Sequence, residues 1–170
     1  MRLQIARVKV PVVGAVCLAA TPHGLVRVHL GDELPRFTRE VQEAFPEADL
    51  GHGGSVVYEA ARAIRAYLAG GPDPDVDVVF LEEGFSARVW REIRKIPRGE
   101  VRSYGRIAKA LRKPLAARAV GQACGRNPVP LVVPCHRVVA SDGGLGGFTG
   151  DLTHKRRLLE LEGVRLDGVR

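Results

Sequence analysis

Cys135 stands directly after Pro134 and is followed by a His-Arg pair, His136 and Arg137. The thiolate form of a cysteine is the nucleophile, and a free thiol has a pKa of roughly 8.5. A neighbouring imidazole can take the thiol proton, and a neighbouring guanidinium favours the anion. We therefore predict that Cys135 is an exposed nucleophile. The dipeptide alone also fits an inert, buried cysteine beside a surface His-Arg pair.

The apolar segment 128–134, Pro-Val-Pro-Leu-Val-Val-Pro, leads into this cysteine. Proline cannot donate to a β-ladder and is confined to edge strands, strand starts and bulges. Because the segment holds three prolines, it does not fit a central strand. We expect a stiff, extended approach that ends at Cys135.

Charge is distributed unevenly along the chain, whose 170 residues carry a formal net charge of +7. Residues 1–84 hold 8 Lys and Arg against 12 Asp and Glu, a net charge of −4. Residues 85–170 hold 18 against 7, a net charge of +11. Excess positive charge in the half that contains Cys135 is typical of a domain that binds a polyanion. A solvated basic surface is the alternative.

The three cysteines, Cys17, Cys124 and Cys135, are an odd number without CxxC spacing. This pattern argues against a disulfide framework and against a structural zinc site. Cys17 could form part of a metal site with His23 and His29, but their spacing suits neither one helix face nor a zinc knuckle. We therefore expect no metal and no cofactor.

The chain is expected to form two domains, residues 1–84 and residues 85–170, in a mixed α/β (α+β) fold. Alternation and Gly/Pro breaks in the first domain predict a small antiparallel sheet with helices. The expected elements are an antiparallel meander over 1–30, helices over 34–46 and 55–69, and a short strand over 76–81. Nothing in this domain indicates chemistry, so we interpret it as a scaffold.

The second domain is expected to be mostly helical and to contain a helix-turn-helix. Apolar spacing predicts helices over 85–96, about 104–111, from Pro114 onward, and about 152–162. On the last helix we expect Lys155 to point outward with its two arginine neighbours and the leucines to point inward.

The helix after Pro114 carries almost no side chain long enough to read base edges. Between Leu115 and Gln122, Arg118 is the only long polar side chain. A smooth Ala/Gly surface with one arginine suits a close approach to a nucleic-acid backbone. A tightly packed core helix is equally compatible with this composition.

No apolar run approaches the ~20 residues of a membrane span, and the N-terminus does not resemble a signal peptide. We therefore expect a cytoplasmic monomer without a membrane partner, associated with the nucleoid if the source is a bacterium or an archaeon.

Several separated blocks carry a resemblance to a known family. They are Ser103-Tyr104, Ala116 to Gly121, Arg126 to Pro130, Pro134 to Val138 and Leu158 to Gly163. In this order they resemble the active-site signature of the O6-alkylguanine-DNA alkyltransferases, also called methylated-DNA–protein-cysteine methyltransferases. The resemblance covers about residues 85–165, so it says little about the N-terminal half.

The resemblance implies that Cys135 accepts the alkyl group of O6-alkylguanine in double-stranded DNA, irreversibly and in a single turnover. O4-alkylthymine is left open as a second lesion. His136 would deprotonate the thiol through a bridging water, and Glu162 would orient the imidazole. Tyr104 would donate a hydrogen bond to the departing oxygen or to a ring nitrogen, and Asn127 would brace the turn around the cysteine.

The resemblance also implies that the helix after Pro114 enters the minor groove, where Arg118 fills the gap left by a flipped base. The expected substrate and DNA contacts are Arg118, Ala116, Ala117, the Val138 amide, Ser141, Phe148 and Thr149. Many relatives carry tyrosine where this chain has Phe148, so a stacking face is kept and a hydroxyl is lost.

Two alternatives belong to other functional classes. A Cys-His hydrolase would use the same pair but would need an oxyanion hole and would turn over repeatedly. A non-catalytic lesion-binding protein would use the helix-turn-helix without the thiol. Because Cys135 is present, the alkyltransferase hypothesis is favoured.

Overall fold

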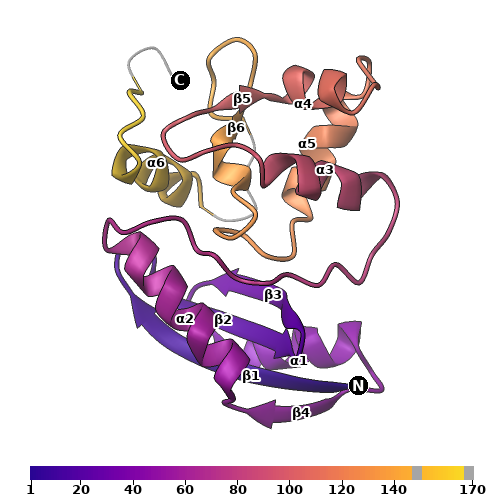
Figure 1. Ribbon diagram of the computed structural model, residues 1–170, viewed down its shortest axis with the longest axis vertical. Helices are drawn as coiled ribbons and strands as arrows, with labels where there is room; N and C mark the ends of the chain where they lie inside the picture. Colours follow the sequence, from indigo (N-terminus) through magenta and orange to yellow (C-terminus); the bar gives the residue numbers. More distant parts are fainter. Residues whose placement is uncertain (147–150, 167–170) are drawn as a thin grey trace. The chain divides into compact units, whose positions relative to one another are not determined.

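The computed structural model of the chain describes residues 1–146 and 151–166. The chain divides into two compact units, Met1–Leu81 and Glu82–Arg170, close to the boundary expected after Gly84 (Figure 1). A mainly antiparallel sheet occurs together with helices, which confirms the predicted mixed fold class. In the described part of the chain, no helix is long and apolar enough to cross a membrane.

The N-terminal unit is built on a four-stranded sheet with the order β3-β2-β1-β4. Its elements are β1 (Arg2–Val10), β2 (Gly14–Thr21), β3 (Gly24–Leu30), α1 (Leu34–Ala44), β4 (Asp49–His52) and α2 (Ser55–Leu68). The predicted meander and both predicted helices are confirmed. Strand β4, which pairs parallel with β1, was missed because Asp-Leu-Gly-His contains no β-branched residue.

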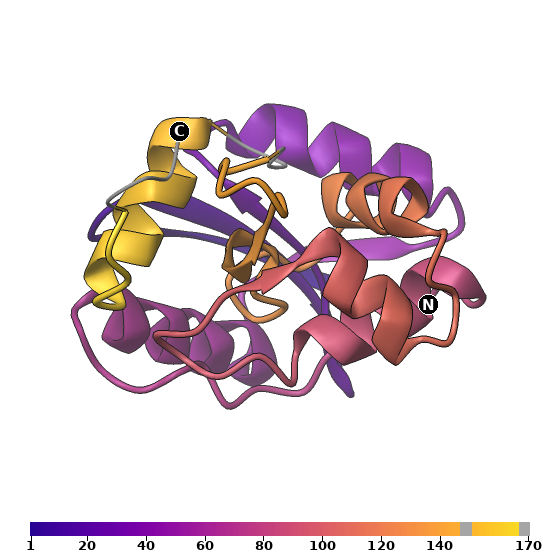
Figure 2. The same ribbon diagram turned by 90° about the horizontal axis from the view of Figure 1, so that it is seen from above.

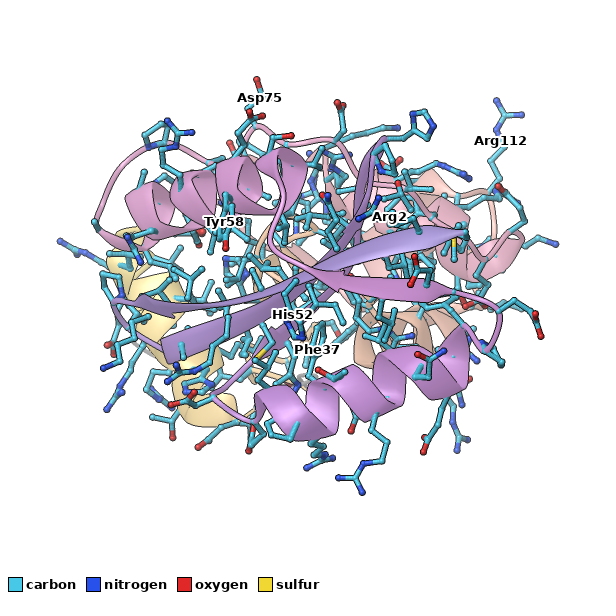
Figure 3. The ribbon with its side chains drawn as sticks, turned by 90° about the horizontal axis from the view of Figure 1, so that it is seen from below. Arg2, Phe37, His52, Tyr58, Asp75 and Arg112 are labelled. Carbon is cyan, nitrogen blue, oxygen red and sulfur yellow. The ribbon has the colours of Figure 1, made fainter. Side chains whose placement is uncertain are left out.

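Helices α1 and α2 cover opposite faces of this sheet (Figures 2 and 3). Phe37 and Val41 of α1 pack with Leu3 of β1 in one hydrophobic cluster. Val57 and Ile64 of α2 are also buried. Strand β2 is buried along its whole length after Gly14, as a strand covered on both faces must be. The sheet is therefore covered by a helix on each face.

The segment 76–81 is not a regular strand, so this prediction was wrong. Its backbone forms only an isolated bridge with β3, in which Leu25 N–H donates to Asp77 O (2.9 Å) and Val79 N–H donates to Leu25 O (2.8 Å). Aspartate is depleted in strands, and Asp77 lies inside the apolar run. The run was therefore too short and too polar for a full strand.

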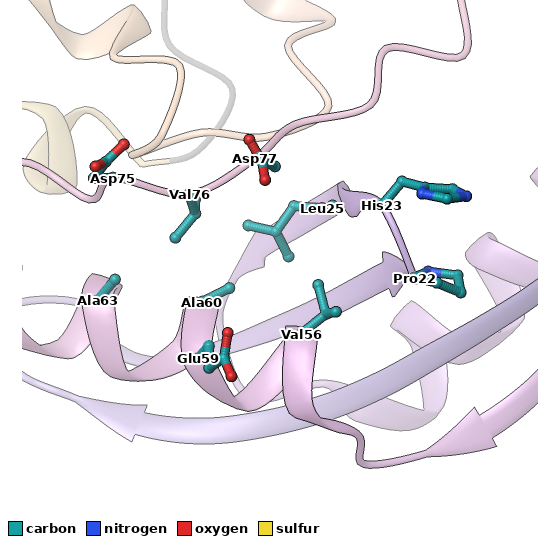
Figure 4. A pocket seen from close by; sticks show the side chains of 11 residues that line it. Pro22, His23, Leu25, Val56, Glu59, Ala60, Ala63, Asp75, Val76 and Asp77 are labelled. Atoms are coloured by element: carbon teal, nitrogen blue, oxygen red, sulfur yellow. The ribbon is translucent and has the colours of Figure 1, made fainter.

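A hollow of about 420 Å³ lies in the N-terminal unit, where this segment passes α2 and β3 (Figure 4). Leu25 and Val76 form part of its apolar wall, and the carboxylates of Glu59, Asp75 and Asp77 belong to its lining. No cysteine lines the hollow.

The C-terminal unit is mostly helical, and its short strands join two loops. Its elements are α3 (Phe85–Ile93), β5 (Arg102–Ser103), α4 (Tyr104–Ala110), α5 (Ala117–Gly125), a single 3₁₀ turn η1 (Cys135–Arg137), β6 (Val138–Val139) and α6 (Leu152–Leu161). Helix α3 packs on α5, where the Trp90 indole N–H donates to Ala123 O (2.8 Å). The Ser103 hydroxyl caps α4 by accepting from Arg106 N–H (3.1 Å).

Helices α4 and α5 form the predicted helix-turn-helix, but α5 begins at Ala117 and not at Pro114. Helix α4 ends because Arg112 adopts a left-handed conformation (φ 58°). Pro114 then occupies the second position of a turn that Ala116 N–H closes by donating to Lys113 O (2.8 Å). Proline suits this turn position as well as a first helical turn, so composition did not distinguish the two.

Lys155 on α6 is fully buried, so the prediction that it points outward was wrong. Its ammonium group donates to Val138 O (2.7 Å) and also contacts Leu145 O. Burial lowers the pKa of this side chain to about 8. Lys155 therefore ties β6 to the glycine-rich loop from inside the protein.

The buried lysine predicts a pH dependence of stability. Between pH 8 and its ordinary pKa of 10.5, the unfolded chain binds a proton that the folded state has released, so stability rises with pH. The free energy of unfolding of the wild type minus that of Lys155→Met should increase between pH 8 and pH 9, by up to about 1.4 kcal/mol per pH unit. Urea unfolding under reducing conditions measures this difference.

Arg156→Met, at the exposed neighbouring position on α6, is the matched control, and its difference from the wild type should stay flat over the same pH range. A flat profile for Lys155→Met as well would contradict the burial of a titrating ammonium group.

Candidate functional site

Cys135 begins the turn η1, and its side chain is buried, with only 2 % of the residue exposed. The prediction of an exposed nucleophile was therefore wrong. The backbone around it is tightly folded, because Cys135 N–H donates to Val133 O (2.8 Å) and Arg137 N–H donates to Pro134 O (2.9 Å). The thiol is thus held in place and shielded from bulk solvent.

Asn127 holds the segment that leads to the cysteine. Its amide NH₂ donates to Val133 O (2.8 Å), and its carbonyl oxygen accepts from Val129 N–H (3.0 Å). Both bonds are buried, so they hold the proline-rich segment in one bend. These are the side chain–backbone contacts that the sequence predicted for this residue.

Glu162, the C-terminal cap of α6, reaches both residues that follow the cysteine. Its Oε1 lies 2.8 Å from His136 Nε2 and 2.7 Å from Arg137 Nη2. Arg137 Nε contacts both carboxylate oxygens, and its Nη1 donates to Ile96 O (2.7 Å). All three side chains are almost fully buried. The contact between Glu162 and His136 was predicted, whereas the bidentate pair with Arg137 was not.

Burial sets the protonation of this cluster. It lowers the pKa of His136 below its usual value, against the opposing effect of the Glu162 carboxylate. Arg137 adds to the lowering because it shares the same carboxylate. His136 is therefore neutral at pH 7, and it donates from Nε2 to Glu162, which leaves Nδ1 in the form of a base.

The other two cysteines lie in environments that keep them protonated. Burial raises the pKa of Cys124 to about 12 and that of Cys17 to about 11. Neither thiol is therefore a nucleophile at neutral pH.

A hollow of about 560 Å³ adjoins α5 and brings together four predicted site residues. Tyr104, Ala117, Arg118 and Ser141 line it, with Gly105, Gly121, Gln122 and Ala140. Parallel pairing of β5 with β6 explains this arrangement, because it brings the start of α4 beside the chain that leaves the Cys135 turn. Cys135, His136 and Glu162 are not among the residues that line the hollow, and all three are buried.

Tyr104 is seated between two glycines. An added Cβ at Gly121 would lie 3.8 Å from the ring, and one at Gly146 (φ 70°) would lie 2.7 Å from Tyr104 Cε2. A side chain at position 146 would therefore collide with the tyrosine, whose hydroxyl lies beside this glycine. This close approach explains the need for glycine in the loop.

The other residues that were predicted to contact the substrate or DNA are Ala116, Val138, Phe148 and Thr149. Ala116 precedes α5 and lines a second hollow of about 450 Å³, with Ala119, Gly84, Phe85, Arg88 and Lys113. The Val138 N–H donates to Cys135 O, so a contact from Val138 to a base edge would use its carbonyl. Phe148 and Thr149 lie outside the described residues. In the part of the chain that the structure describes, no group of three or more His, Cys, Asp or Glu side chains could hold a metal ion.

Sequence reasoning missed the roles of Lys155 and Arg137. For Lys155, the helical spacing of its neighbours could have indicated its burial. Lys155 precedes the buried Leu158 and Leu159 by three and four residues and Glu162 by seven, which places it on the inward face of α6. For Arg137 no periodic signal existed, because its partner Glu162 lies on another element.

Comparison with known proteins places this site in a family. The family model for the 6-O-methylguanine DNA methyltransferase DNA-binding domain matches residues 84–164. The chain is 39 % identical over 153 residues to a methylated-DNA–protein-cysteine methyltransferase of Methanosarcina acetivorans, covering 89 % of this chain and 93 % of that protein. It is 47 % identical over 107 residues to the Mycobacterium tuberculosis protein of that name, covering 62 % of this chain and 65 % of that protein.

The solved structure of the Mycobacterium tuberculosis O6-methylguanine methyltransferase resembles this fold with a TM-score of 0.79 and 34 % identity, covering 94 % of this chain and 92 % of the other. The structure of the same enzyme in complex with DNA aligns with a TM-score of 0.77. The identity, the coverage and the fold agree with one another, so the chain belongs to the methylated-DNA–protein-cysteine methyltransferase family.

Proposed function

We propose that this protein repairs DNA by transferring the alkyl group of O6-alkylguanine to Cys135. The observation that carries this proposal is the buried arrangement in which Cys135 adjoins a neutral His136 held by Glu162. It lies within the residues that match the family's DNA-binding domain. O4-alkylthymine is a second candidate lesion because it offers the same alkyl–oxygen bond.

The reaction is a displacement at the alkyl carbon. The thiol proton passes through a water molecule to Nδ1 of His136, and the sulfur then forms a bond to the carbon as the carbon–O6 bond breaks. The released electron pair goes to O6 and the guanine ring, where the Tyr104 hydroxyl donates a hydrogen bond. The ring then takes up a proton at N1, which balances the proton that His136 accepted, so the products are guanine and an S-alkylcysteine. Because a thioether does not release its alkyl group, each molecule acts once.

The pocket for the base would be formed by the hollow beside α5. O6-alkylguanine keeps the N–H donors of its 2-amino group, and the carbonyl of Val138, two residues before the lining residue Ala140, has a second lone pair besides the one that Lys155 uses. Ser141 lines the same hollow and can contribute further hydrogen bonds. Lys155 positions this carbonyl from inside the protein, so we assign it a positioning role.

Contact with DNA would be made by α5. Arg118 is exposed at its N-terminal end, and the C-terminal unit holds the excess positive charge of the chain. A damaged base must leave the duplex to reach Cys135, which costs a few kcal/mol. A planar guanidinium can stack on bases, so Arg118 can occupy the vacated position. Action on DNA also implies a cytoplasmic, nucleoid-associated location in a bacterial or archaeal cell.

Incubation with a duplex that contains O6-methylguanine tests the assignment of the acceptor. One methyl group per protein molecule should appear on Cys135, and none on Cys17 or Cys124, whose pKa values are raised. Peptide mass mapping locates the group, and Cys135→Ala should be inactive. Methylation at another cysteine, or repeated turnover, would refute the proposal.

Because Glu162 pairs with both His136 and Arg137, variants at His136 and at Glu162 should differ in their effects on the transfer rate and on stability. His136→Gln should slow transfer with little loss of stability, because Arg137 keeps its carboxylate. Glu162→Met should lose about 3–5 kcal/mol of stability, because it leaves a buried guanidinium without a carboxylate. Chemical denaturation and single-turnover kinetics measure the two effects separately.

The double variant Arg137→Met/Glu162→Met separates structure from chemistry. Removal of both charges should restore much of the stability that Glu162→Met loses. Transfer should stay slow, because His136 remains without its orienting carboxylate. Recovery of the transfer rate together with stability would show that Glu162 has only a structural role.

A further inference from the structure

Leu115 is the most exposed large apolar side chain among the described residues. It is 98 % exposed, whereas the other exposed large apolar side chains range from 36 % to 56 %. Burying a leucine on binding a partner gains about 1.5–3 kcal/mol. A single exposed leucine assigns no function by itself, so the backbone and the charges around Leu115 carry the argument.

The backbone presents Leu115 rigidly. It occupies the third position of the turn that Ala116 N–H closes on Lys113 O (2.8 Å), directly after Pro114. The same Lys113 donates its own N–H to Ala108 O (2.9 Å), which fixes the other end of the turn to α4. Because little conformational freedom is left in this turn, ordering it on binding costs little.

The surroundings of Leu115 fit a polyanion. No Asp or Glu occurs between Glu100 and Asp142. The exposed cations Arg112, Lys113 and Arg118 lie within three residues of Leu115 in the sequence, and Arg112 points away from the protein (Figure 3). An apolar tip whose charged neighbours in the sequence are all cations can contact base steps while these cations contact phosphates.

The turn also continues the surface that the proposed function assigns to DNA. Ala116 and Ala119 line the hollow of about 450 Å³, and Ala117 and Arg118 line the hollow of about 560 Å³, so the start of α5 runs between them. Leu115 comes directly before this end of the helix. Minor-groove proteins often insert an apolar side chain between base pairs, which unstacks the step and bends the duplex.

We propose that Leu115 is an apolar wedge that enters the minor groove at a base step beside the flipped nucleotide. Unstacking of that step lowers the free energy needed to extrude the damaged base, and Arg118 then fills the vacated position. This inference rests on the proposed function and adds a residue that acts on the duplex and not on the thiol.

The test uses a duplex in which 2-aminopurine adjoins O6-methylguanine, because its fluorescence rises when the base unstacks. At saturating protein, Leu115→Ala should transfer methyl about tenfold more slowly than the wild type, which corresponds to about 1.4 kcal/mol. The fluorescence rise should be reduced as well. Reaction with free O6-benzylguanine, which needs no flipping, should be unchanged.

Three further variants sharpen the test. Leu115→Met should retain most of the duplex rate, whereas Leu115→Lys should not, although it adds a cation. Leu152→Ala, at an exposed leucine that starts α6, is the matched control and should behave like the wild type.

Several results would overturn the inference. A duplex rate for Leu115→Ala within twofold of the wild type, with an unchanged fluorescence rise, would do so while the proposed function stands. A change in sedimentation of Leu115→Ala without DNA would assign the residue to self-association instead. A wild type that reacts with free O6-benzylguanine but not with the duplex would contradict the proposed function itself, and the wedge with it.

Discussion

The active site depends on one carboxylate that serves two partners. Glu162 at the end of α6 accepts hydrogen bonds from Arg137 and contacts His136, and all three side chains are buried. Isolated burial of any of these groups would be unfavourable, because a charge or polar group without a partner pays a large desolvation cost. The cluster therefore holds α6, the turn that carries Cys135 and the end of α3 in one arrangement, the last through the Arg137 bond to Ile96 O.

This sharing also determines the chemistry of the imidazole. A carboxylate paired with His136 alone would favour the imidazolium, which cannot accept a proton from a thiol. Burial has the largest effect on the pKa of His136 and lowers it, and the positive charge of Arg137 adds to the lowering. The fold thus buries both the Cys135 thiol and a neutral imidazole on the following residue, and the two other cysteines stay protonated because burial raises their pKa values.

The sequence predicted the features that depend on local patterns. Helical spacing located α1, α2, α3, α4 and α6, and the Pro-Cys-His-Arg context located the reactive turn. Burial that depends on packing between distant elements was not predicted, although the family resemblance implied the contact between Glu162 and His136. The turn that carries Cys135 packs against α3 and α6, and Lys155 is inside because the carbonyls of Val138 and Leu145 accept hydrogen bonds from its ammonium group. The start of α5 was placed too early because Pro114 suits a turn and a first helical turn equally.

Nitrogen NMR of His136 tests the central claim most directly. The chain contains 5 histidines, so a spectrum of ¹⁵N-histidine protein can be assigned by comparison with His136→Gln. At pH 7 we expect a neutral ring with a proton on Nε2 and none on Nδ1, because burial, the largest influence on this side chain, lowers its pKa. A doubly protonated His136 in the wild type at pH 7 would contradict this account.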